Sequence, residues 1–263
     1  MADRASRSSS VSGNLAGGLL GQRGHGGHLQ LWSADDHQHD HWREYAVCGN
    51  YCSGQGGGIF NDTSGSVTIN NSSVTGNLAG ATLSVANGGG IYNSGRVTIS
   101  NSTIGGNTAS FGQGGGIYNG AGMTINNTTI SGNTATRFGK GDNVYSVGAV
   151  VIQNSIIANG VNGNCYGSVT SIGYNSSSDG TCKFNYTGDL NNTDHKLGPL
   201  QNNGGPKQTM ALLSGSPAID AGNPNGCMDS NGHLLRTDQR DMPRPDKEDS
   251  VGCDMGAYES QSD

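Results

Sequence analysis

The chain has 263 residues, of which 46 are glycine and 13% are charged, and its formal net charge is −6. This length and composition predict one elongated domain with a different C-terminal part, not two globular domains. The acidic balance, with no visible stripe of basic residues, disfavours a nucleic-acid-binding protein. Low hydrophobicity alone favours disorder, but a clear internal repeat overrides that expectation, since regular β-stacking needs few large side chains.

The first recognisable segment, residues 8–18 (S-S-S-V-S-G-N-L-A-G-G), is similar to the end of a repeat unit found later at residues 72–80. We therefore expect the chain to begin part-way through a coil, as a fragment of a longer protein. Nothing similar to a signal peptide precedes this segment, and no apolar run is long enough for a transmembrane helix.

Residues 27–45 differ in composition from the rest of the chain, because they hold both tryptophans and four of the seven histidines. On an extended strand, alternate side chains point to opposite faces. Such a strand would place His37, His39 and His41 on one face and Asp36 and Asp40 on the other.

Three imidazoles on one face suit a divalent transition metal, zinc or manganese, with a fourth position open for water. A metal-bound water becomes a hydrolytic nucleophile near neutral pH, so the cluster predicts a metal-dependent hydrolase as one candidate function. Further ligands or a general base are expected among His25, His28 and Glu44.

A second interpretation of residues 27–45 is that they are a repeat unit translated out of frame. Reading each codon from its second base turns both tryptophans into glycine, and suitable wobble bases give G-I-Y-N-S-G-R-L-T-I-T-N-T-T-I-G-G-N-T. Residues 90–108 differ from this sequence only at Val97, Ser100 and Ser102. The same segment is then an accident that binds metal only as an engineered histidine tag does.

A repeat of about 26 residues runs through the middle of the chain, and internal repeats decide the fold before any other signal. G-G-G-I-F-N at residues 56–61 recurs as G-G-G-I-Y-N at residues 88–93 and 114–119, with a degraded copy from Gly141. Two columns of apolar residues recur at nearly the same step: Ile69, Ile99, Ile125 and Ile152, and Val74, Ile104, Ile130 and Ile156.

Within each unit, apolar residues alternate with Thr, Ser and Asn, which is the period of a strand with one buried face. One unit cannot bury its apolar face alone, but stacked units can. The sequence thus predicts an all-β fold, a right-handed parallel β-helix with an irregular C-terminal capping region. Corner asparagines are expected to form a hydrogen-bonded ladder: Asn77, Asn107, Asn133 and Asn159.

We divide the chain into an atypical N-terminal segment (1–50), the coils of about 26 residues (51–165), and the last coils with a loop-rich cap (166–263). Two cysteine pairs, Cys165 with Cys182 and Cys227 with Cys253, are expected to form the disulfides of an exported protein. Cys48 and Cys52 lie close to the proposed return to the normal frame and carry no such expectation.

The C-terminal part carries a series of motifs in a fixed order. They are S-I-G-Y-N (171–175), G-D-L-N-N-T-D-H-K-L-G-P-L (188–200), N-N-G-G-P (202–206), G-S-P-A-I-D-A-G-N (215–223), T-D-Q-R (237–240), R-P (244–245) and C-D-M-G-A-Y-E (253–259). After the G-G-G-I-Y-N repeats, this order resembles the bacterial choice-of-anchor Q family over residues 54–259. The resemblance implies a right-handed parallel β-helix, export and a cell-surface setting, and it supplies no catalytic residues.

The C-terminal part is expected to cover the open end of the solenoid, where unpaired strand edges promote aggregation. Five of its charged residues form a candidate site, which we interpret as ion pairs and turn caps. These residues are Asp220, Asp238, Arg240, Asp254 and Glu259.

The function expected from these features is a secreted or cell-surface β-helix with a structural, adhesive or glycan-binding role. Recurring aromatic residues could either contact sugars or stack on one another as a structural ladder, namely Phe60, Tyr92, Tyr118 and Tyr145. The variable outward positions argue against ice binding. A polysaccharide lyase or glycoside hydrolase is a further alternative by fold analogy. The repeats offer it few charged residues: Asp62, Asp142, Arg96, Arg137 and Lys140.

Overall fold

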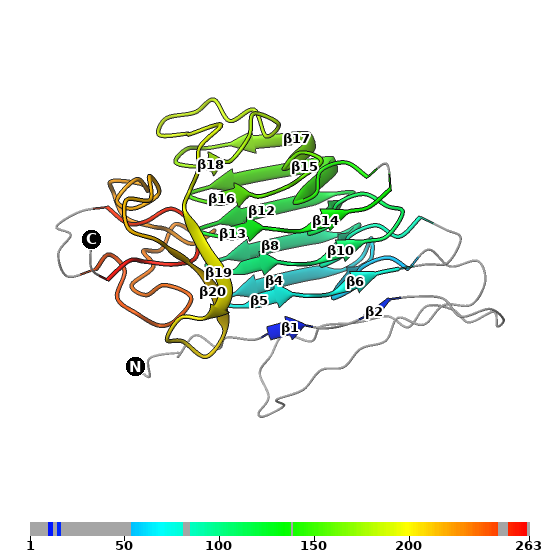
Figure 1. Ribbon diagram of the computed structural model, residues 1–263, viewed down its shortest axis with the longest axis horizontal. Helices are drawn as coiled ribbons and strands as arrows, with labels where there is room; N and C mark the ends of the chain where they lie inside the picture. The colour runs from blue at the N-terminus through cyan, green and yellow to red at the C-terminus, as the bar shows by residue number, and fades with distance from the viewer. Residues whose placement is uncertain are drawn as a thin grey trace.

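The computed structural model describes residues 54–80, 85–137, 139–246 and 252–261, together with the backbone of the short strands β1 (Ser10–Ser12) and β2 (Leu15–Ala16). All regular structure in these residues is β, and none of them is helical. The strands stack as coils of a parallel β-helix (Figure 1). The predicted fold class is confirmed.

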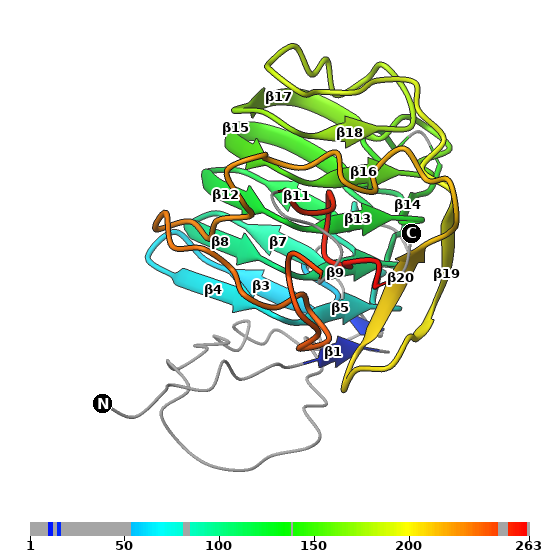
Figure 2. The same cartoon turned by 90° about the vertical axis from the view of Figure 1, so that its left-hand side faces the viewer.

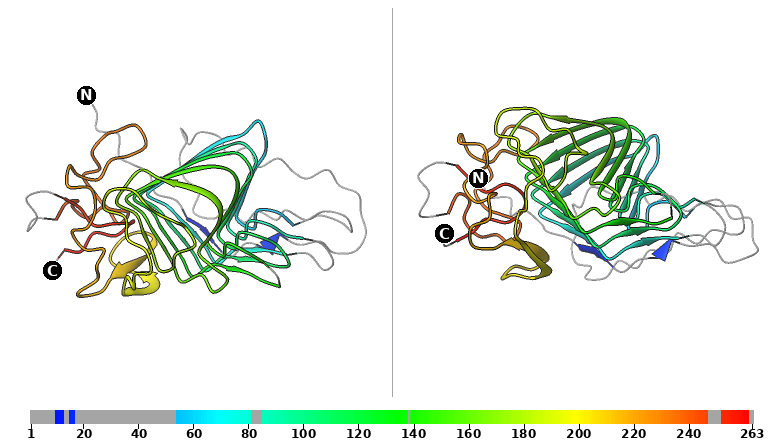
Figure 3. Two further views of the ribbon diagram at one scale, coloured as in Figure 1. Left: turned by 90° about the horizontal axis from the view of Figure 1, so that it is seen from above. Right: turned by 45° about the horizontal axis from the view of Figure 1, so that its top comes forward.

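Three parallel stacks make the walls of the solenoid, and Figure 3 shows the coils superimposed when they are seen from above. The longest strand, β15, belongs to two rows of strands and joins them into one sheet. That sheet contains β3 (Ile59–Asn61), β7 (Ile91–Asn93), β11 (Ile117–Asn119), β15 (Val144–Gln153), β12 (Gly122–Asn126), β8 (Arg96–Ser100) and β4 (Ser66–Asn70), and β17 (Cys165–Ser171) pairs with β15.

The other two stacks are built from shorter strands. One contains β1, β5 (Ser73–Thr75), β9 (Thr103–Gly105), β13 (Thr129–Ser131), β16 (Ile156–Ala158) and β18 (Ser176–Ser177). The other contains β2, β6 (Leu78–Ala79), β10 (Thr108–Ala109) and β14 (Thr134–Ala135). A separate antiparallel hairpin follows, formed by β19 (Leu197–Asn202) and β20 (Gln208–Leu212).

The interior of the solenoid is a set of aliphatic columns, because the same inward position recurs in each coil. Ile69, Ile99, Ile125 and Ile152 stand in register, as the alternation predicts. In the second predicted column, however, Ile130 pairs with Ile157, so the prediction of Ile156 was wrong. Ile156 points outward and packs against the C-terminal part.

Asparagine ladders line the corners of the coils. Asn77 donates to Asn107, and Asn107 donates to Asn133, as predicted. The next rung is Asn143 rather than Asn159, since Asn133 donates to Asn143 at 2.8 Å. Asn143 takes the place that Gly116 holds one coil earlier, where an added Cβ would lie only 2.9 Å from the Asn133 amide.

The C-terminal part closes the solenoid in two ways. The Cys165–Cys182 and Cys227–Cys253 disulfides both form as predicted, and Cys182 and Phe184 are buried in the main core. Residues 178–193 thus cover the last coil, as the sequence leads us to expect. The remainder, residues 194–246 and 252–261, runs down the side of the solenoid across β5, β9, β13 and β16 (Figure 2); we name these described residues the lateral strap.

The lateral strap contacts successive described coils along the solenoid, which an end cap could not do. The Ser73 hydroxyl donates to the Gln208 carbonyl on the first coil, and Thr103 donates to Gln239 on the second. The Ala257 amide donates to Thr129 on the third coil. The strap covers polar outward positions of this sheet, which explains why serines and threonines there are buried.

Candidate functional surfaces

Five aromatic side chains form a continuous stack on the outer face of the solenoid; we name this stack the aromatic column. It consists of Phe60, Tyr92, Tyr118, Tyr145 and Tyr166, one from each successive coil. Neighbouring ring centroids are 5.0–5.4 Å apart and neighbouring ring planes differ by 2–11°. The column arises because parallel in-register pairing places the same outward position of each coil directly above the last.

Stacking leaves the rings' edges, and not their faces, for an external partner. Each inner ring has an aromatic neighbour on both sides, so a sugar ring cannot lie flat on it. Among the described residues, no protein group hydrogen-bonds the hydroxyls of Tyr92, Tyr118, Tyr145 or Tyr166. Burial, followed by the neighbouring Tyr92 and Tyr145, raises the pKa of Tyr118, which keeps this hydroxyl a hydrogen-bond donor.

The sequence predicted four of the five rings and missed Tyr166. Tyr166 follows Tyr145 at a shorter interval than the repeat step, because that coil has no strand equivalent to β14. The dipeptide Cys165-Tyr166 replaces the Ile-Tyr of earlier coils, and that substitution is the only signal that could have identified it.

A row of outward threonines lies on the strands that follow the aromatic column. Thr68, Thr98 and Thr124 stand in register, but the next position is Val151 before Thr170 continues the row. The neighbouring outward position changes from serine to arginine to glycine to alanine along the same strands. This irregularity fits the expectation that the face does not match an ice lattice.

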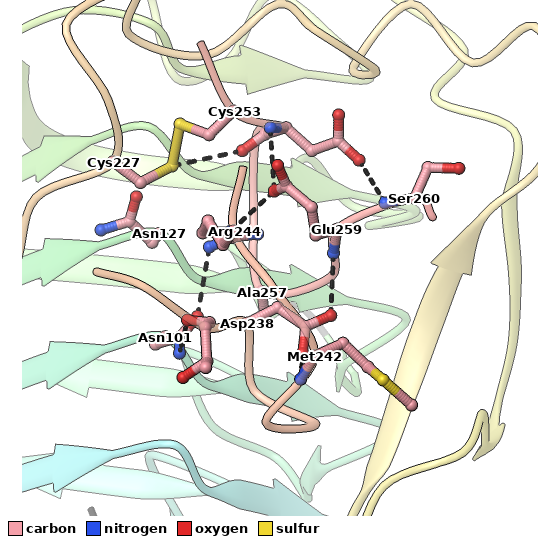
Figure 4. Close-up of polar contacts among 12 residues, drawn as sticks. Asn101, Asn127, Cys227, Asp238, Met242, Arg244, Cys253, Ala257, Glu259 and Ser260 are labelled. Atoms are coloured by element: carbon pink, nitrogen blue, oxygen red, sulfur yellow. Dashed lines mark hydrogen bonds and ion pairs between the residues drawn. A yellow bond between two sulfur atoms is a disulfide. The ribbon is translucent and has the colours of Figure 1, made fainter. Parts of the chain in front are cut away.

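The predicted charged site is a buried ionic cluster between the lateral strap and the solenoid (Figure 4). Arg240 pairs with Asp238 at 2.7 Å, and Arg244 pairs with Glu259 at 2.7 Å, all four side chains being nearly inaccessible. Arg244 also donates to Asn101, a corner residue of the second coil. The cluster holds the strap against the solenoid, which agrees with the predicted ion pairs and adds Arg244 as the partner that the sequence did not identify.

Two carboxyl groups of this cluster have altered acidity. Burial, and then the charge of Glu259, raises the pKa of Asp254 to about 7. Burial also raises the pKa of Glu259, against the opposing effect of Arg244. Asp254 accepts hydrogen bonds from the backbone amides of Asp220 and Ser260, so it acts as a turn cap. The fifth predicted residue, Asp220, contributes only its backbone, because its side chain is exposed.

A buried serine–histidine contact has two of the residue types found in the catalytic triad of a serine hydrolase. His195 Nε2 lies 2.6 Å from the Ser176 hydroxyl. Both residues are buried, and His195 Nδ1 has no hydrogen-bond partner, so no carboxylate orients the ring. Burial lowers the pKa of His195 to about 4. The contact therefore links the strap to the last coil and cannot reach a substrate.

The predicted metal ligands Asp36, His37, His39, Asp40 and His41 lie outside the described residues, so zinc or manganese binding there stays a prediction. Within the described ranges, no group of three His, Cys, Asp or Glu side chains is arranged to hold a metal ion.

The charged residues considered for polysaccharide cleavage do not converge. Asp142 is buried and accepts hydrogen bonds from the backbone amides of Ala135 and Asn162. Asp62 accepts from the backbone and hydroxyl of Ser64 at a corner of the first coil. Each carboxylate is therefore engaged in capping a turn, which does not support a lyase or hydrolase centre built on them.

In the part of the chain that the structure describes, no helix is long and apolar enough to cross a membrane. Comparison of the chain with models of protein families, with curated proteins and with solved structures finds no match in any of the three.

Proposed function

We propose that this chain is a secreted or cell-surface β-helix that binds an elongated polysaccharide along the aromatic column. The observation that carries the proposal is the row of tyrosine hydroxyls without protein partners, held at regular steps on a rigid wall. Rigid, partly exposed tyrosines offer hydrogen bonds at little entropic cost. The ring spacing is of the same size as one residue of an extended β-linked polysaccharide.

Export is the second part of the proposal. Two disulfides among the described residues favour an oxidising compartment. The resemblance to the choice-of-anchor Q family implies the same setting, a bacterial surface or the medium around it. A stiff solenoid suits a structural or adhesive role there, because repeated coils present an extended binding surface.

The test removes the hydroxyls and keeps the rings. The triple variant Tyr92→Phe, Tyr118→Phe, Tyr145→Phe retains the stack, and Tyr186→Phe changes an exposed tyrosine outside the column. Binding of the full chain to a panel of soluble polysaccharides is measured by affinity electrophoresis and calorimetry.

We expect the triple variant to bind about tenfold or more weaker, since each lost hydrogen bond costs about 0.5–1.5 kcal/mol, with an unchanged melting temperature. The Tyr186→Phe variant should bind like the unmodified chain. Equal binding by the triple variant, or no binding to any polysaccharide, contradicts the proposal.

A further inference from the structure

Two cations lie over aromatic rings at one edge of the solenoid; we name this group the cationic edge. The Arg137 guanidinium carbon is 4.8 Å from the ring centroid of Phe111, and Lys140 Nζ is 4.6 Å from the ring centroid of Tyr166. Tyr166 is the last ring of the aromatic column, so the cationic edge continues the surface to which we assign polysaccharide binding.

The charges at the cationic edge are not neutralised by the protein. Among the described residues, neither Arg137 nor Lys140 forms an ion pair with a carboxylate. The nearest acidic residue in sequence, Asp142, is fully buried, and its carboxylate accepts hydrogen bonds from backbone amides and forms no ion pair with either cation. In a chain of net charge −6, this edge is therefore a local positive site.

Both aromatic partners are exposed to solvent, Phe111 at 41% and Tyr166 at 43%. A cation over an exposed ring gains about 0.5–1 kcal/mol, and the ring also limits the cation's freedom. The rings thus hold both cations close to the surface in defined positions, which lowers the entropic cost of binding an anion.

The backbone at this edge adopts an uncommon conformation for its residue types. Phe111 and Arg137 have φ values of 58° and 52°, whereas most positive-φ positions in the coils are glycine or asparagine. A bulky side chain in this region carries a conformational cost of order 1–3 kcal/mol. The two residues occupy consecutive coils, where the Phe111 amide donates to the Thr136 hydroxyl and the Lys140 amide donates to Gln113.

Among the described residues, the lateral strap lies away from the cationic edge. The loops after β10 and β14, which carry Phe111, Arg137 and Lys140, project from the side of the solenoid opposite the strap (Figures 1 and 3). A polymer lying along the aromatic column could reach Lys140 without displacing any described segment of the chain.

We infer that the polysaccharide is acidic, with carboxylate-bearing sugar residues that contact Lys140 and Arg137 while their hydroxyls contact the aromatic column. This inference rests on the proposed function and specifies its substrate class. A nucleic acid is disfavoured, since its binding depends on neutralising many phosphates with a run of cations, and the edge offers two.

The experiment compares two probes with the same sugar backbone, polygalacturonate and its fully methyl-esterified form. The double variant Arg137→Gln, Lys140→Gln removes the cationic edge. Lys183→Gln, Arg236→Gln removes the same amount of charge from two exposed positions elsewhere and serves as the matched control. A double-stranded DNA of similar length tests for unspecific polyanion binding, and all variants are the full chain.

We expect polygalacturonate to bind more tightly than the ester and to lose about tenfold in affinity in the edge variant, as two exposed charge pairs predict. The control variant should change little, and added salt should remove the preference for the acid. Equal binding of acid and ester, or DNA binding as tight as polygalacturonate, overturns the inference.

The two proposals fail in different ways. If acid and ester bind equally, and the tyrosine-to-phenylalanine variant weakens both, the glycan-binding proposal stands and the acidic class is wrong. If the edge variant binds polygalacturonate as the unmodified chain does, the cationic edge is not the contact. Absence of binding to either polymer and to the wider panel overturns both proposals.

Discussion

Among the described residues, Arg244 is the largest fully buried side chain, and it forms an ion pair with Glu259. Replacing it with methionine keeps most of the volume but leaves the Glu259 charge buried and unpaired. Breaking a buried pair in this way costs about 3–5 kcal/mol. We expect Arg244→Met to lower the free energy of unfolding in urea by that amount.

The matched control for this change is Arg236→Met, since Arg236 is exposed and contributes a backbone carbonyl to the same region. A surface change of this kind should stay within about 0.5 kcal/mol of the unmodified chain. If both variants unfold at the same urea concentration, the ion pair does not secure the lateral strap.

The carboxyl of Asp254 gives the strap a pH dependence. Its pKa is raised by burial and by Glu259 to about 7 in the folded chain, so the folded state binds this proton more tightly than the unfolded state does. The contribution of Asp254 to stability is therefore full below about pH 4, its usual range, and is lost as pH rises through about 7. The effect is on the order of a few kcal/mol.

Unfolding measured at pH 5 and pH 8 tests this dependence. The Asp254→Asn variant cannot titrate at this position, so its stability should differ less between the two pH values than that of the unmodified chain. Asp241→Asn, at an exposed position nearby, should preserve the original difference. The same pH difference in all three chains would show that Asp254 does not titrate as the structure implies.

At the scale of the elements, the three glycines that precede β11, residues 114–116, allow neighbouring coils to approach closely. An added Cβ on Gly115 would lie 2.4 Å from backbone atoms of Thr134, and no flexible side chain is there to move. Gly122, in the following strand, has no atom within 4 Å of such a Cβ. The two positions provide a matched pair for one substitution.

We expect Gly115→Ala to lower stability by about 1–3 kcal/mol or more, because overpacked sites force backbone shifts. Gly122→Ala should be neutral or stabilise by up to about 1 kcal/mol, since it restricts the unfolded chain without a clash. Thermal unfolding followed by circular dichroism measures both. Equal melting temperatures for the two variants would show that the run is not a close-contact element.

The repeat predicted the strands well where each coil keeps the same motif, as for β4, β8 and β12, although the step between their isoleucines changes from 30 to 26 residues. Residue type alone did not distinguish Ile156 from Ile157, because both are isoleucine. The spacing did distinguish them, since the second column follows the first by five residues in the earlier coils and Ile157 follows Ile152 by five. The ladder position of Asn143 was not predicted because it replaces a glycine in the motif.

At the scale of the whole molecule, periodic contacts were predictable and irregular ones were not. Parallel coils and two disulfides follow from repeat spacing and cysteine count. The lateral strap gives no such signal, because its contacts join Gln239 to Ser73 and Arg244 to Asn101, far apart in an irregular chain. The hydrophobic pattern identified the core, and the strap's polar contacts needed the structure.

At the N-terminal end of the solenoid, the described strands cover the edges of two stacks and leave the edge of the third uncovered. β1 and β2 pair with β5 and β6, but no described strand lies beside the outer edges of β3 and β4. A unit with the sequence G-I-Y-N-S-G-R-L-T-I-T-N-T-T-I-G-G-N-T contains the two strands that those edges would accept. This is the sequence obtained when residues 27–45 are read from the second codon base.

Replacing residues 27–45 with that unit should therefore add a coil and stabilise the solenoid, because stacked repeats gain an interface with each neighbour. A gain of even 1 kcal/mol raises the melting temperature by about 2–4 °C. A chain with residues 27–45 scrambled is the control, and it should melt like the unmodified chain.

Elemental analysis of the unmodified chain tests the other interpretation of residues 27–45, the metal site. Zinc or manganese bound per chain, and lost in His37→Ala, His39→Ala, His41→Ala, would make the segment a metal site instead, and the replacement would then remove a function while adding a coil.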